Sequence, residues 1–378
     1  MGKRILVVIG GSYVSGLEVV TLHLIKGLKA SGHEVRCLVN GWNDNQFKGL
    51  LDDLKVPYEE AKLGWLYITK PLWTIDTLIH LPGAYLKSRK VIRNFKPDVL
   101  HFCNYGTVIM LSPLLKNKNC VYNLQEPHAP TRNNRYFYRL VNRRVKVFTA
   151  VSAYIEKVLI DLNIPKDKIR VIYNGVPATH RTSEKQQGER IIFAIVGQVA
   201  SWKGHDTLVD AVKLLIEASC PAFEVKIFGN NKNAYAEELK KRIQEKNIES
   251  YFTWEGFVRD QDSIYDQSDV VIVPSLSQEP CSLTILESMM RKKGLIVSDR
   301  GGNPELVRHK DTGLIFSAGD PADLAGCLRM VLENPAMIPA MGKRAGQKAL
   351  EVFTADRMTK EYVSVYAEMG TAGKPGSI

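Results

Sequence analysis

The chain carries one local pattern twice: an apolar strand, a glycine-containing turn, a helix and a second strand. The first copy reads "RILVVIGGS", then the helical pattern "GLEVVTLHLIKGLKASGH", then "EVRCLVN". The second copy reads "RIIFAIVGQV", the loop "ASWKG", the helical pattern "HDTLVDAVKLLIEAS" and "FEVKIFGN". A β-turn-α-β unit of this kind starts a parallel, doubly wound sheet. We therefore predict an α/β fold with two Rossmann-like domains.

The length of 378 residues favours the same division into two domains, each large enough for its own core. We predict an N-terminal domain at 1–176, a polar linker at 177–189 and a C-terminal domain at 190–355. The helical pattern at 356–370 has no strand after it and is expected to pack back across the domain join, and 371–378 reads as a flexible tail. Because ligands of open parallel sheets sit outside the carboxyl ends of the strands, we expect the two sheets to face a central cleft.

Cysteine usage and hydropathy indicate the cellular compartment in which the chain is expected. The six cysteines are scattered without a close pair, which argues against a zinc site and a disulfide framework. The opening "MGKRILVVIGG" has an apolar run too short for a secretory signal, and no uninterrupted apolar stretch reaches the roughly 20 residues that span a bilayer. We therefore expect a cytoplasmic protein.

The positive charge belongs to one half of the chain. Residues 1–176 hold 26 lysines and arginines against 13 acids, a net of +13, and residues 177–378 hold 25 against 27, a net of −2. The first half should therefore meet an anionic partner, such as a membrane surface, nucleic acid or an acidic substrate. No RNA-recognition or zinc-finger signature is present, so we do not expect nucleic acid.

Two acids in "QEPCSLTILESMM", Glu279 and Glu287, follow the apolar run "DVVIVPS" and have seven residues between them. One interpretation is that the first acid caps a helix and the second faces water. The other is that both hold one elongated, hydroxyl-rich ligand. A helix throughout would separate them by about 12 Å and place Glu287 about two turns into it. An anionic group of that ligand would then lie near the helix N-terminus, whose free N–H groups suit an anion.

Lys203, in "SWKGH", falls on a turn between a strand and a helix. It could be an ordinary surface lysine, or a compact cation that binds an anionic group of a ligand. Gly204 would let the backbone approach closely.

Taken in order, "GGS", "VIYNGV", "VGQVASWKG", "VPSLSQEPCSLTILES" and "GGNPELV" make residues 3–365 resemble the retaining glycosyltransferases of family 4, which have the GT-B fold. The resemblance implies transfer of a hexose-type sugar from a nucleoside diphosphate sugar with retention of configuration. It implies that Glu287 binds the ribose, that Glu279 binds the donor hexose, and that Lys203 binds the donor phosphates.

Two positions depart from the family pattern. The family places an arginine before the lysine, where this chain has Gln198, which can donate a hydrogen bond but carries no charge. The family also commonly ends a strand with a histidine near "CVYNLQEPHAP", where this chain offers Glu126 and His128. We predict both as catalytic cleft residues, although a simple turn is the alternative. Front-face transfer needs no protein nucleophile, because the departing phosphate can accept the acceptor's proton.

The resemblance adds further donor contacts, each of which could equally be an ordinary turn. Glycines of the first turn would approach the diphosphate, loop residues would touch the base and phosphates, and N–H groups after Glu279 would point at the donor. The residues concerned are Gly10, Gly11, Gly16, Gly204, Gly229, Val258, Ser282 and Leu283. The inserted "SYVS" leaves the register of the first glycines open.

We expect no metal or other cofactor, because the Asp-x-Asp pair of metal-dependent sugar transfer is absent and Lys203 with helix dipoles can supply the positive charge.

The predicted co-substrates are a nucleotide-sugar donor and a glycan or lipid-linked acceptor in cell-envelope polysaccharide or glycolipid synthesis. The alternatives are a nucleotide-sugar epimerase of the same fold and a catalytically silent binding subunit, to which Gln198 lends some weight.

The stretch at 63–96 mixes aromatic residues with cations, and "RYFYRLVNRRVK" at 135–146 repeats this mixture. In the stretch at 63–96, these aromatic and basic residues are Trp65, Tyr67, Trp73, Tyr85, Lys87, Arg89, Lys90, Arg93 and Lys96. An aromatic helix packed in the core with a solvated basic face would give the same pattern. We favour the boundary of an anionic bilayer, and expect an enzyme bound peripherally to the inner face of the plasma membrane.

Overall fold

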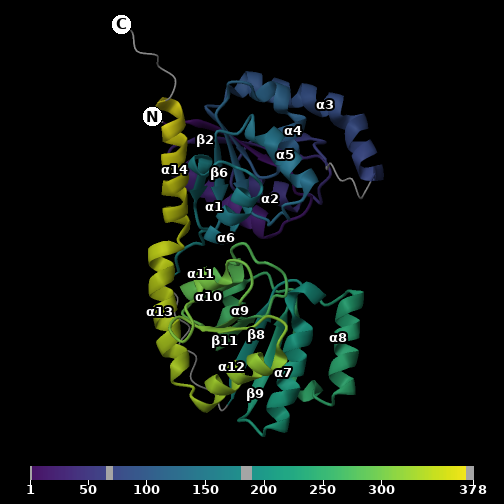
Figure 1. Ribbon diagram of the computed structural model, residues 1–378, viewed down its shortest axis with the longest axis vertical. Coiled ribbons are helices and arrows are strands. Elements are labelled where there is room, and N and C mark those ends of the chain that lie inside the picture. Colours follow the sequence, from purple (N-terminus) through teal and green to yellow (C-terminus); the bar gives the residue numbers. More distant parts are fainter. Residues whose placement is uncertain (1, 65–70, 180–189, 372–378) are drawn as a thin grey trace. The chain divides into compact units, whose positions relative to one another are not determined.

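Two parallel sheets organise the chain, one in each of two compact units (Figure 1). The computed structural model describes residues 2–64, 71–179 and 190–371. Unit 1 comprises Met1–Pro177 with Ala355–Ile378, and unit 2 comprises Ala178–Thr354. Most of the predicted linker and the predicted tail beyond Thr371 lie outside the described residues.

Unit 1 contains a seven-stranded sheet in the order β3-β2-β1-β4-β5-β6-β7. Its strands are β1 (Arg4–Ile9), β2 (Glu34–Asn40), β3 (Tyr58–Ala61), β4 (Val99–Phe102), β5 (Cys120–Leu124), β6 (Val147–Ala150) and β7 (Ile169–Val171). Its helices are α1 (Gly16–Ala30), α2 (Gln46–Asp53), α3 (Pro71–Phe95), α4 (Tyr105–Met110), α5 (Arg132–Asn142), α6 (Ala153–Asp161) and α14 (Ala355–Thr371), with 3-10 turns η1 (Ser112–Leu115) and η2 (Lys166–Lys168).

Unit 2 contains a six-stranded sheet in the order β10-β9-β8-β11-β12-β13. Its strands are β8 (Ile191–Val196), β9 (Phe223–Phe228), β10 (Phe252–Gly256), β11 (Val270–Val273), β12 (Gly294–Ser298) and β13 (Leu314–Phe316). Its helices are α7 (His205–Glu217), α8 (Ala234–Glu245), α9 (Gln261–Asp266), α10 (Leu283–Met290), α11 (Asn303–Leu306), α12 (Pro321–Glu333) and α13 (Met337–Val352), with 3-10 turns η3 (Ser201–Lys203) and η4 (Glu249–Tyr251).

Every strand pair in both sheets is parallel, and the central strands are buried along their length. Strands covered on both faces must be apolar throughout, which explains runs such as "VVIV" in β11. The strand order reverses between β1 and β4 in unit 1, and between β8 and β11 in unit 2. The predicted α/β fold with two doubly wound, Rossmann-like domains is therefore confirmed. Ligands bind at such reversal points, outside the carboxyl ends of the strands.

The last helix, α14, is part of the core of unit 1, although it comes nearly two hundred residues after β7 in the chain. The Tyr366 hydroxyl lies 2.8 Å from Nδ1 of His101 on β4, and the Tyr362 hydroxyl lies 3.2 Å from Thr149 Oγ1 on β6. Its Thr359 packs so closely on α1 that a Cβ at Gly27 would overlap it. Aromatic side chains of α14 thus anchor it within this unit.

None of the helices within residues 2–64, 71–179 and 190–371 has both the length and the apolar character needed to cross a bilayer. All six cysteines lie in the described part of the chain and are free thiols.

We predict that unit 1 loses stability on mild acidification because of His101. The side chain is fully buried, and burial lowers its pKa from 6.5 to about 4. The neutral ring therefore stabilises the fold above pH 6.5, and this contribution is lost as pH falls towards 4. Between pH 7.5 and pH 5 the loss should be roughly 2 kcal/mol. Urea unfolding at these pH values would measure it, and His101→Gln, which does not titrate, should show a smaller loss. An equal loss in both proteins would contradict the prediction.

Candidate active site

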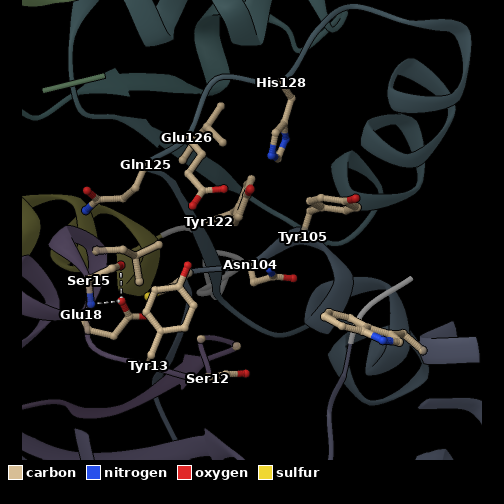
Figure 2. Close-up of a pocket in the computed structure, with 16 residues that line it drawn as sticks. Ser12, Tyr13, Ser15, Glu18, Asn104, Tyr105, Tyr122, Gln125, Glu126 and His128 are labelled. Carbon is tan, nitrogen blue, oxygen red and sulfur yellow. Dashed lines mark hydrogen bonds between the residues drawn. The ribbon is translucent and has the colours of Figure 1, made fainter. Parts of the chain in front are cut away.

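The first candidate site is a pocket in unit 1, at the reversal point of its sheet. Its volume is about 330 Å³, and the loops after β1, β4 and β5 line it (Figure 2). Four predicted residues meet there, since Gly10 and Gly11 follow β1 while Glu126 and His128 follow β5. Predicted Gly16 is instead the first residue of α1 and is not part of the pocket lining.

Aromatic and acidic side chains line this pocket. The rings of Tyr13, Tyr105 and Tyr122 line it together with two carboxylates, Glu18 and Glu126 (Figure 2). No lysine or arginine belongs to its described lining. Carboxylates accept hydrogen bonds from hydroxyl groups, and aromatic rings offer flat apolar surfaces with a polar edge. Such a lining suits an uncharged, hydroxyl-rich ligand better than an anion.

Glu18 is held at the start of α1 by the loop before it. The Ser15 backbone N–H and Ser15 Oγ both donate to Glu18 Oε2, at 3.0 and 2.5 Å. Burial raises the pKa of this carboxyl, the hydrogen bonds from Ser15 oppose the rise, and the charge of Glu126 adds to it. A Cβ at Gly11 would come within 1.9 Å of Glu18 Oε1, so only glycine allows this approach. Glu18 therefore fixes the shape of the pocket floor.

His128 belongs to an aromatic cluster at the opposite side of the pocket (Figure 2). Its Nδ1 lies 2.7 Å from the Tyr138 hydroxyl, and its ring meets Tyr105 edge-on at 5.2 Å between centroids. Burial lowers the pKa of His128 to about 4, so the imidazole is neutral at physiological pH. It can position a hydroxyl group but adds no positive charge. The Glu126 side chain is exposed at the pocket.

The second candidate site lies in unit 2, where Lys203 and Glu279 meet. Lys203 Nζ forms an ion pair with Glu279 Oε1 at 2.6 Å, and Ser275 Oγ donates to the same oxygen at 2.6 Å. Lys203 Nζ also lies 4.2 Å from the centre of the Trp202 ring. Glu279 is buried, and both partners bind the same carboxylate oxygen. The structure thus brings together the cation and the first of the two predicted acids.

The turn "GGNPEL" holds the backbone of Glu279 in place. The Gly302 N–H donates to the Glu279 carbonyl at 2.7 Å. Gly301 has a φ of +59°, and a Cβ there would come within 2.2 Å of the same carbonyl oxygen. This glycine is required both by conformation and by close approach. The turn therefore acts on the site through Glu279.

Glu287 is buried on α10 and is fixed from a neighbouring helix. It accepts hydrogen bonds from Gln261 Nε2 and from the Tyr265 hydroxyl, each at 2.8 Å. Burial raises the pKa of Glu287, while the bond from Tyr265 opposes the rise. The predicted position of Glu287, about two turns into the helix, was wrong. Because α10 begins at Leu283, Glu279 precedes the helix and Glu287 lies little more than one turn into it.

Most of the other predicted donor contacts follow strands of unit 2 or begin α10, and Gly204 is the N-cap residue of α7. Gln198 is exposed after β8, Val258 is half-buried after β10, and Gly229 is buried after β9. Gly204 has a φ of +78°, and a Cβ there would come within 1.9 Å of the Pro274 carbonyl oxygen. Ser282 is the N-cap residue of α10, and its side chain makes no capping hydrogen bond.

Sequence reasoning missed the residues that position the two acids. Ser275 ends the apolar run "DVVIVPS", so its place at the carboxyl end of a strand could have identified it. Gln261 and Tyr265 reach Glu287 from α9, and nothing in the local sequence links them to it. In unit 1, Asn104 and Tyr105 follow β4 and line the pocket without having been singled out.

Within the described part of the chain, no group of three or more histidines, cysteines or acids is arranged to hold a metal ion.

Comparison with known proteins gives a consistent assignment. Residues 14–180 match the model of Glycosyltransferase Family 4, and residues 178–349 match that of Glycosyl transferases group 1. The uncharacterized glycosyltransferase MJ1607 of Methanocaldococcus jannaschii is 23% identical, over 93% of this chain and 94% of its own length.

Solved structures show the same fold. A glycosyltransferase from Rickettsia africae has a TM-score of 0.83 at 20% identity, over 98% of this chain and 100% of that chain. HepE of Anabaena, solved in complex with UDP-glucose, has a TM-score of 0.80 at 20% identity, over 97% of this chain and 100% of that chain. With both halves matched in order, the chain belongs to the family 4 glycosyltransferases of the GT-B fold.

Proposed function

We propose that this glycosyltransferase moves a hexose-type sugar from a nucleoside diphosphate sugar to a glycan or lipid-linked acceptor, with retention of anomeric configuration. The observation that carries the proposal is the cluster of Lys203, Ser275 and Glu279 just before α10, with Glu287 on that helix. A related fold in HepE holds UDP-glucose, which supports a nucleotide-sugar donor.

The donor is assigned to unit 2 as follows. Its diphosphate lies at the N-terminus of α10, where free N–H groups and the helix dipole favour an anion. Lys203 meets the phosphates and leaves its ion pair with Glu279 to do so. Glu287 accepts hydrogen bonds from the ribose hydroxyls, and Glu279 accepts them from the hexose. Lys203 and the helix supply the positive charge, so transfer by this route needs no metal.

The acceptor is assigned to the pocket of unit 1, whose tyrosines and carboxylates suit a hydroxyl-rich sugar. In the transfer step the bond between the anomeric carbon and the phosphate oxygen breaks, and a bond to the acceptor oxygen forms on the same face. The acceptor's proton passes to the departing phosphate oxygen. Glu126 and neutral His128 orient the acceptor hydroxyl.

We also propose that the enzyme works at the inner face of the plasma membrane, in the synthesis of envelope polysaccharide or glycolipid. The net charge of +13 in residues 1–176 supports this location. Trp65 and Tyr67, which contributed to the sequence prediction, lie outside the described residues.

A panel of nucleotide sugars tests the donor assignment. A ligand at 100 times its dissociation constant should add about 2.7 kcal/mol to the stability of the protein. We expect one nucleoside diphosphate hexose to raise the melting temperature and to release its diphosphate on incubation. Stabilisation without release under any condition would favour a silent binding subunit, and interconversion of the donor sugar would favour an epimerase.

We predict that Lys203→Ala lowers kcat about a hundredfold, because the lysine opposes phosphate charge that grows as the sugar leaves. The melting temperature should change little, since Ser275 still binds Glu279 in the variant. Steady-state kinetics and thermal unfolding measure both effects. Lys213→Ala is the matched control, because Lys213 is a surface lysine of α7 paired with Glu217. Equal turnover in the two variants would remove Lys203 from the mechanism.

A further inference from the structure

The outer side of α3 exposes large apolar side chains along its first turns. Leu72, Ile75, Ile79 and Leu86 are three, four and seven residues apart, which places them on one side of the helix. We call these four residues the apolar stripe. Ile79 is 69% exposed and Leu86 is 61% exposed. Single exposed apolar residues are ordinary, but a contiguous stripe of them marks an interaction surface.

The last turns of the same helix border a basic hollow, formed by Arg89, Arg93, Lys96 and Lys118. Its volume is about 430 Å³, and no acidic residue is among its described lining. In the described part of the chain, no ion pair or side-chain hydrogen bond reaches any of these four cations. The negative end of the helix dipole favours cations at the end of α3, but Lys118 comes from the segment after η1. Cations from two segments therefore converge without a neutralising partner.

The apolar stripe and the basic hollow form one continuous surface. Arg93 follows Leu86 by seven residues, so it continues the stripe along the same side of α3. Figure 1 draws α3 along the outside of unit 1, and Pro82 lies inside the helix. Apolar residues followed by cations on one side are the pattern of a helix that lies in a membrane interface.

This surface also leads to the pocket of unit 1. Trp73, next to Leu72 in the first turn of α3, lines that pocket and is about half exposed. Tyr13, from the loop after β1, lines the same pocket and is exposed. A surface bound along the apolar stripe would therefore lie beside the pocket that we assign to the acceptor.

We propose that the apolar stripe and the basic hollow together dock unit 1 on an anionic phospholipid bilayer. The stripe enters the boundary between headgroups and acyl chains, and the basic hollow binds lipid phosphates. The arrangement presents the pocket of unit 1 to an acceptor held in the membrane. This inference deepens the proposed membrane location and is tested by binding alone, so it does not depend on sugar transfer.

The test is sedimentation of the purified full chain with phosphatidylglycerol-containing vesicles and with phosphatidylcholine vesicles, at low and high salt. The wild-type protein should bind the anionic vesicles, and the binding should weaken with salt. Arg89→Ala with Arg93→Ala should weaken it about 25-fold, since each basic residue near an anionic surface contributes about 1 kcal/mol. Ile79→Ser with Leu86→Ser should weaken it at least about tenfold, because two exposed apolar side chains no longer enter the bilayer.

Lys26→Ala with Lys360→Ala is the matched control. It removes two exposed lysines from α1 and α14, which pack together. The right-handed crossovers of the sheet place α1 on the opposite face from α3. This variant should bind vesicles nearly as well as the wild type. Thermal unfolding of all variants, measured without vesicles, shows whether each of them is folded.

Three results would overturn the proposal. Equal weakening by the control pair would mean that overall charge, and not the basic hollow, causes binding. Unchanged binding in both α3 variants would place the membrane contact elsewhere. Absence of vesicle binding, together with a wild-type dimer that Ile79→Ser with Leu86→Ser dissociates, would make the apolar stripe an interface between two copies of the chain. Donor turnover in that last case would leave the proposed sugar transfer standing.

Discussion

Glu279→Ala is expected to lower kcat about a thousandfold while changing donor affinity less than tenfold. In the described part of the chain, Lys203 and Ser275 both reach Oε1 of Glu279. Oε2 therefore has capacity for the hydroxyls of the donor hexose. These bonds strengthen as the sugar ring gains positive charge. Losing them therefore raises the free energy of the transition state more than that of the bound donor.

Single-turnover kinetics with saturating donor would separate this effect from binding. Glu333→Ala, at an exposed position near the end of α12, is the control for loss of a surface acid. Glu279→Gln keeps the shape of the side chain and should recover part of the lost rate. If Glu279→Ala turns over like the wild type, the acid serves only to hold the loop before α10.

Glu287→Ala should have the largest effect on donor binding, raising its dissociation constant about a hundredfold. Hydrogen bonds to a charged group contribute about 1.5–3 kcal/mol each, and 1.4 kcal/mol corresponds to tenfold. Gln261 and Tyr265 each occupy one carboxylate oxygen of Glu287, which leaves lone pairs for the ribose hydroxyls. A ribose contact is equal in ground and transition states, so kcat at saturating donor should change little.

Isothermal titration with the donor and with its nucleoside diphosphate would measure this loss, which should be the same for both ligands. The alanine variant leaves the buried Tyr265 hydroxyl without its acceptor, so Glu287→Gln is needed to separate binding from folding. Glu238→Ala, exposed on α8, is the surface control. Full affinity in Glu287→Gln and Glu287→Ala would mean that the acid has a structural role only.

The doubly wound plan could be predicted because parallel strands buried on both faces read as unbroken apolar runs. The runs "RILVVI" and "RIIFAIV" are of this kind, and each ends in a turn. The edge strand β3, "YEEA", carries two acids and gives no such signal, and β13 has only three residues. The position of α14 in unit 1 depends on contacts of Tyr362 and Tyr366 with distant strands, which local patterns do not encode.

The candidate site was predictable where residues directly follow strands. Lys203, Glu279 and Glu287 were predicted from motifs that resemble those of the family 4 glycosyltransferases, and the structure joins the first two directly. The predicted helix began too early, because the spacing estimate treated the chain as helical from Glu279 onwards. The stretch "EPCS" carries no strong helix signal, and α10 begins only after it. Partners that come from another element, such as Tyr265, become visible only when the chain is folded.

The most direct test of the function is donor cleavage followed by nuclear magnetic resonance. The purified protein is incubated with the nucleoside diphosphate hexose that stabilises it, and early spectra record the anomeric configuration of the sugar product. We predict release of the nucleoside diphosphate, a product with the configuration of the donor, and near-complete loss of both signals in Glu279→Ala. Inverted product would contradict the retaining mechanism. Failure of every nucleotide sugar to bind or react with the wild-type protein would contradict the assignment of unit 2 as a donor site.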